Sequence, residues 1–271
     1  MRVRRRVLLT IFVALFTVGY ALVSQTHIAR AQDDPDAVAG GDAQSTIEPE
    51  ALSVLKEMSD ALSSQQNFSF DAEVSYDEFL NSGQMIKLGG TLKITVKRPD
   101  KIYAKFSGDE VQRKAWYNGK ELTVLNQKKG FYGTLETPGT IDKTLDYLME
   151  SYDFTLPIAD ILHTDLYGSF SDGAVGGVIV NDSIVRGKEC SHLAFVGELI
   201  DWQLWVSTKK PALPCKLVIT YKKMEGVPQY QAIFSKWNLK PKVPDSLFKP
   251  DLPNDAVKID FINEKKQRGG K

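Results

Sequence analysis

The stretch NFSFDAEVSYDEF at residues 67–79, followed by MIKLGGTLKITVK at residues 85–97, decides the fold of this chain. Apolar and polar side chains alternate in both runs, and a period of two is typical of a β-strand with one buried and one solvated face. The polar stretch Asn81-Ser82-Gly83 between the runs predicts a turn. We therefore expect one long antiparallel hairpin, with a bulge or sharp bend at Gly89-Gly90.

Further strand-like runs extend this hairpin into a meander. Asn118-Gly119, a strong short hairpin signal, lies between the runs at residues 111–117 and 120–126. The other predicted strands lie at residues 101–106, 131–136, 176–182, 188–196, 201–207, 215–223, 229–237 and 256–261. The pattern thus predicts a sheet of about 10–12 strands.

Helical periodicity is confined to three segments. Residues 49–65 begin with a proline suited to a first helical turn, and leucine and methionine side chains then recur every three or four residues. Residues 140–152 have Thr140 as a cap and one apolar stripe, and residues 157–163 predict a shorter helix. The run PDSLF at residues 244–248 predicts a single helical turn.

These elements predict a mainly β fold of the α+β class. An open, strongly twisted sheet of this size tends to curl, and the helices must bury their apolar stripes. We expect a single large curled antiparallel sheet that forms an unclosed half-barrel, with helices across its concave face. The strands at 201–207 and 215–223 are apolar on both faces. Either core and helices cover both faces, or one face lines a cavity.

The N-terminal residues predict export. MRVRRR is followed by an uncharged apolar run at residues 7–23 and by Ala29-Arg30-Ala31, which together are typical of a secretory signal peptide. We expect residues 1–31 to be the signal peptide, with cleavage between Ala31 and Gln32 and release into the periplasm. An uncleaved membrane anchor is the alternative, although the apolar run is short for a span.

The remaining chain divides into three parts. Residues 32–46 are acidic and rich in glycine and alanine, and predict a disordered leader. We expect residues 47–263 to form the folded domain and residues 264–271 to form a disordered basic tail. Removal of five arginines with residues 1–31 leaves 29 basic against 34 acidic residues, a net charge of −5. This balance argues against nucleic acid as a partner. Separately, we expect the protein to be a monomer.

Cys190 and Cys215 are the only two cysteines. An even number of cysteines in an oxidising compartment permits one disulfide, whereas two buried free thiols are the alternative. In a simple meander the two residues lie on strands separated by one other strand. Neighbouring strands are about 4.8 Å apart, so a bridge would need a bulge or a detour of residues 208–215.

No constellation typical of an enzyme is present in the sequence. The motifs HExxH, GxSxG, GxxxxGK[ST] and GxGxxG are absent. His163 and His192 are the two histidines beyond residue 31, and we expect both to be structural. We therefore expect no catalytic residues, no metal site and no cofactor. The combination of a curved sheet with many large apolar side chains instead favours a space for an apolar ligand.

Several longer runs carry a resemblance to a known family. They are RPDKIYAKF (98–106), WYNGKELTVLN (116–126), TPGTIDKTLDYL (137–148), FTLPIADIL (154–162), RGKECSHLAF (186–195), DWQLWVSTKKPALPCKLVITY (201–221) and W-x(5)-VPDSLF (237–248). Over residues 48–262 the chain resembles an uncharacterised family of bacterial predicted periplasmic proteins, which is similar in turn to the LolA/LolB-like superfamily of lipoprotein carriers and receptors. The resemblance implies an unclosed β-barrel with a helical lid and an apolar cavity for acyl chains.

The function expected from these observations is that of a soluble periplasmic binding protein for lipid acyl chains or a lipidated polypeptide. A sensor or regulator on the same fold, which would bind an envelope membrane protein, is the alternative, and a hydrolase is the less favoured one. We expect binding to depend on the concave apolar face and not on any ionisable group. The candidate ligand-binding residues are Phe68, Phe70, Val74, Leu92, Ile94 and Val96 of the first hairpin and Leu145, Leu148 and Tyr152 of the lid.

Overall fold

The computed structural model describes residues 46–152 and 156–261 of the chain. The predicted signal peptide with its cleavage position, nearly all of the predicted leader and the predicted basic tail therefore lie outside the described residues. The described residues form one sheet of 12 strands in the order β12-β6-β5-β4-β3-β2-β1-β11-β10-β9-β8-β7. Its two end strands, β12 and β7, do not pair with each other, so the sheet is an unclosed half-barrel, as the sequence predicted.

The first hairpin sets the register of the sheet. Strand β1 (Asn67–Phe79) pairs with β2 (Met85–Lys97) so that Phe70 lies opposite Ile94. The meander continues through β3 (Lys101–Gly108), β4 (Gln112–Tyr117), β5 (Glu121–Asn126) and β6 (Phe131–Glu136). The predicted turn at Asn118-Gly119 is confirmed, because Asn118 Oδ1 accepts hydrogen bonds from the backbone N–H groups of Lys120 and Glu121, and Gly119 has a φ of +87°.

No bulge interrupts the first hairpin at Gly89-Gly90, so the expectation of a bulge was wrong. The pairing of β1 with β2 runs through both glycines without a shift of register. The glycines instead permit a close approach of neighbouring backbones. A Cβ atom on Gly90 would lie 2.6 Å from the Cα atom of Gly108 on β3.

The second half of the sheet comes from the C-terminal part of the chain. It consists of β7 (Ala174–Val185), β8 (Lys188–Gly197), β9 (Ile200–Ser207), β10 (Pro214–Tyr221) and β11 (Gln229–Asn238). Strand β11 pairs antiparallel with β1 and thereby joins the two halves. The short strand β12 (Val257–Lys258) pairs in parallel with β6, so the sheet is mostly but not wholly antiparallel.

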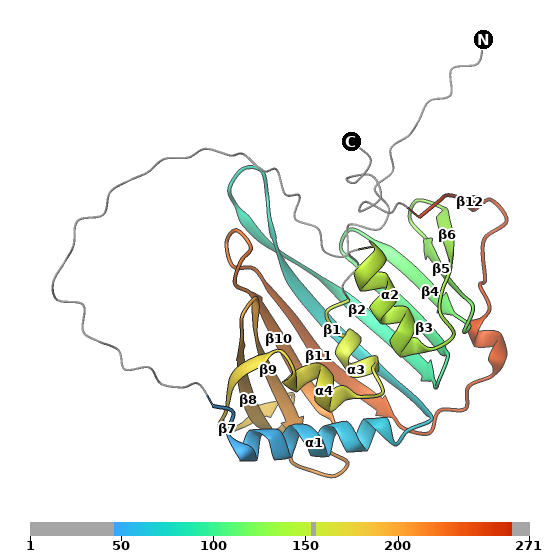
Figure 1. Cartoon of the computed structure of the whole chain (residues 1–271). Helices are drawn as coiled ribbons and strands as arrows, with labels where there is room; N and C mark the ends of the chain where they lie inside the picture. Colours follow the sequence, from blue (N-terminus) through green and yellow to red (C-terminus); the bar gives the residue numbers. More distant parts are fainter. Residues whose placement is uncertain (1–45, 153–155, 262–271) are drawn as a thin grey trace.

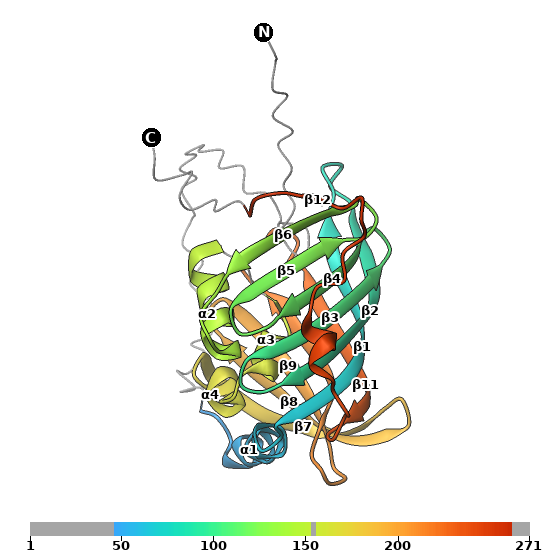
Figure 2. The same ribbon diagram turned by 90° about the vertical axis from the view of Figure 1, so that its right-hand side faces the viewer.

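Helices lie in the opening of the half-barrel and along one end of it (Figures 1 and 2). Helix α1 (Pro49–Ser63) runs across the end of the half built from β7–β11, and α2 (Ile141–Tyr152) and α3 (Ala159–Leu162) lie over the concave face. These three confirm the predicted helical segments, and the turn Asp245–Phe248 confirms the prediction for PDSLF. In the described residues, strand residues outnumber helical residues by more than two to one, in agreement with the predicted mainly β fold.

Helix α4 (Leu166–Ser171) was not predicted. Asp165 caps its N-terminus, since the Asp165 carboxylate accepts a hydrogen bond of 2.9 Å from the backbone N–H of Gly168. The helix buries Leu166 and Phe170 in the main core. With only six residues and a glycine, it has too few turns to show a helical period in the sequence. No helix in the described part of the chain has the length and hydrophobicity of a membrane span.

Candidate functional site

An apolar cavity of about 140 Å³ lies between the concave face of the sheet and helices α2 and α3. The first hairpin and the strands that follow it provide one wall, and the lid helices with the residues next to them provide the other. The apolar side chains of the sheet wall include Val74, Leu92, Ile94, Ile102, Phe106 and Leu122. Those of the lid wall are Ile141, Leu145, Leu148, Leu156, Pro157 and Leu162.

The structure brings five of the nine predicted ligand-binding residues to this cavity. They are Val74, Leu92, Ile94, Leu145 and Leu148. The alternation in the first hairpin identifies the concave face correctly, because the buried positions of β1 and β2 face one another across the hairpin in the predicted register. That these residues bind a ligand stays a prediction.

The other four predicted residues do not line the cavity. Phe68, Phe70 and Val96 are buried in the main core, where the Phe70 ring lies 4.5 Å from the ring of Trp237 on β11. Tyr152 packs instead against Tyr147, with 5.7 Å between the ring centroids. Alternation identifies the face on which a side chain lies, but not which part of that face other side chains cover.

A buried charge in the cavity wall was missed by the sequence analysis. Arg113 of β4 lines the cavity with only 7% of its surface exposed. In the described part of the chain, no carboxylate or carbonyl oxygen accepts a hydrogen bond from its guanidinium. The sequence contains a signal for this position, since alternation along residues 111–117 places Arg113 on the same face as Ala115 and Tyr117.

The electrostatics around Arg113 are dominated by burial. Burial lowers the pKa of Arg113, and the opposing effect comes from the neighbouring Tyr76. Burial likewise raises the pKa of Tyr76, and the positive charge of Arg113 opposes that rise. Both side chains line the cavity, Tyr76 from β1 and Arg113 from β4.

Two further polar side chains of the cavity wall already have partners. The hydroxyl of Tyr117 donates a hydrogen bond of 2.7 Å to the carbonyl oxygen of Pro138, and the hydroxyl of Thr144 donates one of 2.9 Å to the same oxygen. These bonds join the start of α2 to the sheet.

A larger groove of about 720 Å³ lies on the other side of the lid. Its far wall is formed by side chains of β9 and β10 and the residues after them, which include Ile200, Ile219 and Tyr221. The groove and the cavity share four lining residues, namely Leu145, Leu148, Leu156 and Pro157. A single layer of lid side chains therefore separates the two spaces.

Arg98, at the turn between β2 and β3, connects the lid to the sheet. Its guanidinium donates hydrogen bonds of 2.9 Å and 3.0 Å to the carbonyl oxygens of Leu162 and His163 at the end of α3. It also lies 5.4 Å from the centre of the Phe68 ring. Burial lowers the pKa of Arg98, and Asp142 of α2 opposes that shift. Arg98 thus fixes the end of α3 against the buried end of the first hairpin.

Asp160 of α3 lies in the wall of the groove, and burial raises its pKa to about 6. The charge of His163 opposes this shift. Because the folded state then binds the proton more tightly than the unfolded state, the stabilisation is complete below about pH 4 and is lost as the pH rises through about 6.

We expect Asp160→Asn to raise the free energy of unfolding at pH 8 by about 1–2 kcal/mol, because the amide removes a charge that is costly to bury. This range is below the full value of the pKa shift, since the side chain is partly solvent-exposed. At pH 4 the two proteins should be equally stable. Urea unfolding at both pH values measures the difference, and exposed Glu198→Gln controls for the general loss of a charge. Equal stability at pH 8 would contradict the prediction.

The two histidines occupy structural positions. His192 stacks on Trp205 with 3.9 Å between ring centroids and shares a hydrogen bond of 3.0 Å with Gln203 on the convex face. His163 follows α3 as its C-cap and lies 4.0 Å from Asp142 and 3.9 Å from Asp146. Within residues 46–152 and 156–261, no group of three histidine, cysteine or acidic side chains could hold a metal ion.

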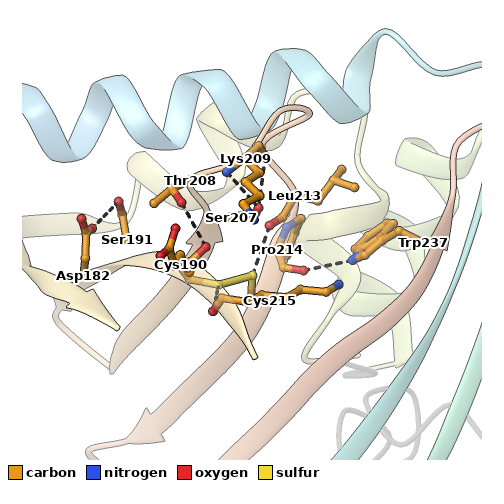
Figure 3. The surroundings of a disulfide bond; sticks show 12 residues. Asp182, Cys190, Ser191, Ser207, Thr208, Lys209, Leu213, Pro214, Cys215 and Trp237 are labelled. Carbon is orange, nitrogen blue, oxygen red and sulfur yellow. Dashed lines mark hydrogen bonds between the residues drawn. A yellow bond between two sulfur atoms is a disulfide. The ribbon is translucent and has the colours of Figure 1, made fainter. Parts of the chain in front are cut away.

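Cys190 of β8 and Cys215 of β10 form a disulfide on the convex face (Figure 3). The two strands are separated by β9, as the meander predicted, yet the two Cα atoms lie only 7.0 Å apart. The pairing of β10 with β9 shifts register between Pro214 and Lys216, and this irregularity places Cys215 near the end of β9. The disulfide packs with Trp205 and Val218 in a small cluster of its own.

This small cluster also explains why β9 and β10 are apolar on both faces. Their inward side chains, which include Leu204 and Leu217, belong to the main core, whereas Trp205 and Val218 face outward around the disulfide. Core packing therefore accounts for both faces over most of these strands. The side chains of β9 and β10 that also border a groove are Ile200, Trp202, Leu217, Ile219 and Tyr221.

Comparison with known proteins identifies a family and several distant structural likenesses. The sequence model of a family described as "Predicted periplasmic protein (DUF2092)" matches residues 51–262. A comparison of the sequence with curated proteins finds no match.

Three solved structures illustrate the structural likenesses. The lipoprotein LppX of Mycobacterium tuberculosis is 14% identical, with a TM-score of 0.46 over 73% of this chain and 100% of LppX. A LolA superfamily protein from Nitrosomonas europaea is 10% identical, with a TM-score of 0.38 over 74% of this chain and 97% of that protein. The MucA/MucB complex of Pseudomonas aeruginosa contains a chain that is 13% identical, with a TM-score of 0.38 over 74% of this chain and 61% of that chain. At these values, none of the three transfers a function to this chain.

Proposed function

The chain belongs to the DUF2092 family of predicted periplasmic proteins, and we propose that in the periplasm it binds the acyl chain of a lipid or of a lipidated polypeptide. The observation that supports this proposal is the apolar cavity between the concave face and the lid. Transfer of an acyl chain from water into such a space contributes about 0.8 kcal/mol for each buried methylene. The proposed role is binding alone, and it assigns no catalytic residue.

The size of the cavity sets a condition on binding. A volume of about 140 Å³ is close to that of an engineered apolar cavity that holds benzene. It therefore holds only part of an acyl chain. A longer ligand would displace the side chains shared with the groove, namely Leu145, Leu148, Leu156 and Pro157, and would occupy both spaces.

Truncation of the cavity wall tests the proposal. We expect Ile94→Ala and Leu148→Ala to lower the free energy of unfolding by only about 1–2 kcal/mol, because both side chains already border a space that the core does not fill. At a filled core position the same kind of truncation costs about 2–5 kcal/mol. Ile161 and Leu55 are matched controls, since both are fully buried and neither lines the cavity or the groove.

The same variants should weaken the binding of a fluorescent fatty-acyl probe, measured by titration. His192→Ala should leave probe binding unchanged, because His192 lies on the convex face against Trp205. Severe unfolding of Ile94→Ala together with no probe binding by the parent protein would contradict the proposal and identify the space as ordinary core.

A second candidate function is supported by the exposed edge of the sheet. Strand β7 is an end strand, and its side chains Val178, Val180 and Ile184 are 41%, 48% and 75% exposed. Ile47 and Glu48 already bond this edge at Gly177 and Ile179. Beyond that point, an exposed apolar edge strand can pair with an extended segment of another protein. This observation favours a sensor or regulator that binds an envelope protein.

Analysis of the protein purified from its native periplasm separates the two functions. Solvent extraction followed by mass spectrometry should yield a stoichiometric lipid if the cavity binds acyl chains. An empty cavity, with an envelope protein held in a stoichiometric complex that Val180→Lys dissociates, would instead support the sensor.

A further inference from the structure

Arg113 is a charged side chain in a place where burial of a charge is costly. It lies on β4 opposite Phe106 of β3 and Asn126 of β5, on the concave face. The arginine is 7% exposed and lines a cavity whose other walls are mainly aliphatic and aromatic. A buried charge normally has an ion-pair partner or several hydrogen bonds, since otherwise its desolvation is not offset.

The described residues do not supply such a partner. The amide oxygen of Asn126, on the neighbouring strand, accepts a hydrogen bond of 3.1 Å from the backbone N–H of Lys129. Glu78, Glu110 and Asp109 raise the pKa of Tyr76 through their negative charge, but the opposing effect on Arg113 itself comes from Tyr76. In the described residues, therefore, no carboxylate neutralises the guanidinium.

We propose that Arg113 binds the anionic head group of a single-chain amphiphile, so that the cavity selects anionic acyl lipids over neutral ones. The guanidinium presents a planar fork of donors that matches a carboxylate or a phosphate. The acyl chain then extends from Arg113 along Leu92 and Ile94 toward Leu148 of the lid. This inference rests on the proposed function and names the class of ligand for the same site. It differs from the expectation, stated above, that binding depends on no ionisable group.

Three amphiphiles of equal chain length test the proposal on the full chain without its signal peptide. Hexadecanoic acid and hexadecyl phosphate carry an anionic head, and hexadecanol carries a neutral one. Each displaces a neutral apolar fluorophore, N-phenyl-1-naphthylamine, from the protein. We expect both anions to bind at least tenfold more tightly than the alcohol, which is the factor that a hydrogen bond to a charged group contributes. The anion that binds more tightly identifies the head group as carboxylate or phosphate, and either result supports the proposal.

Arg113→Met should weaken the binding of both anions by about tenfold to a hundredfold and leave hexadecanol within about twofold. Lys114→Met is the matched control, because Lys114 is the next residue of β4 and faces the convex side beside Trp116. It removes the same charge from the protein and should leave the binding of all three amphiphiles unchanged.

Thermal unfolding checks that Arg113→Met is folded. We expect its Tm to equal or exceed that of the parent protein, since methionine removes an unpaired buried charge and keeps most of the packing. Arg113→Lys is the second variant. It retains the charge but loses the planar fork, and it should show an intermediate loss of anion affinity.

Two results would overturn the inference, and they are distinguishable. If all three amphiphiles bind equally well to the parent protein and to Arg113→Met, Arg113 does not bind a head group although the acyl-binding function stands. If none of the three binds to the parent protein, the proposed function fails and this inference fails with it.

Discussion

Replacement of Phe70 by alanine should lower the free energy of unfolding by about 3–5 kcal/mol, the cost of removing a fully buried aromatic side chain from a core. Phe70 is 1% exposed, and its ring lies 4.5 Å from that of Trp237 and 5.6 Å from that of Phe234. These contacts join β1 to β11, where the two halves of the sheet meet. Loss of the ring therefore leaves a void at the junction of the sheet.

Phe79→Ala provides the matched control for this prediction. Phe79 ends the same strand but is only partly buried, so its truncation should cost about 1 kcal/mol. Urea unfolding monitored by circular dichroism gives both values. Equal, small losses for the two variants would show that Phe70 borders a space that the core does not fill, as the sequence analysis expected.

Removal of the disulfide should lower the free energy of unfolding by about 3 kcal/mol. Cys190 and Cys215 are 25 residues apart, and the loss of a cross-link over a loop of that length increases the chain entropy of the unfolded state by roughly this amount. The double variant Cys190→Ala/Cys215→Ala measures the effect by urea unfolding. Added reductant should destabilise the parent protein by a similar amount and leave the double variant unchanged.

Thiol counting on the denatured, unreduced protein checks the premise of that prediction. No free thiol should react when the protein is isolated from an oxidising compartment. Two reactive thiols would show that the cysteines are not bridged in the protein, and the expected loss of stability on reduction would then not occur.

Much of the fold could be predicted from local patterns, because those patterns are set by neighbours close in the chain. The alternation in residues 67–79 and 85–97 predicts the antiparallel pairing and the buried face of β1 and β2, and Asn118-Gly119 predicts a turn that the backbone adopts. The periodic stripe in residues 49–65 predicts α1 to within two residues. Features without a periodic signal were missed, such as α4 with its six residues and the parallel pairing of β12.

The candidate site was less predictable, since a cavity is a property of what the chain leaves uncovered. The sequence places Phe70 and Ile94 on one face, but only the position of Trp237 on β11 decides that Phe70 is covered and Ile94 is not. Arg113 was overlooked because a lone arginine in a strand resembles an ordinary exposed residue. The irregular pairing near Pro214, which brings Cys215 within reach of Cys190, likewise depends on the neighbouring strand.

The disulfide cross-links only one of the two halves of the sheet. It fastens β8 to β10 across β9, in the half that also carries α1 (Figure 1). Most of the sheet residues that line the cavity come from β1–β5, which have no cross-link among the described residues and are held to one another through backbone hydrogen bonds and side-chain packing. The half of the sheet that contains β8–β10 is therefore cross-linked, whereas β1–β5 are not. Under the proposed function, the ligand contacts strands without this cross-link, so we expect β1–β5 to adjust to its width and length while β8–β10 keep their arrangement.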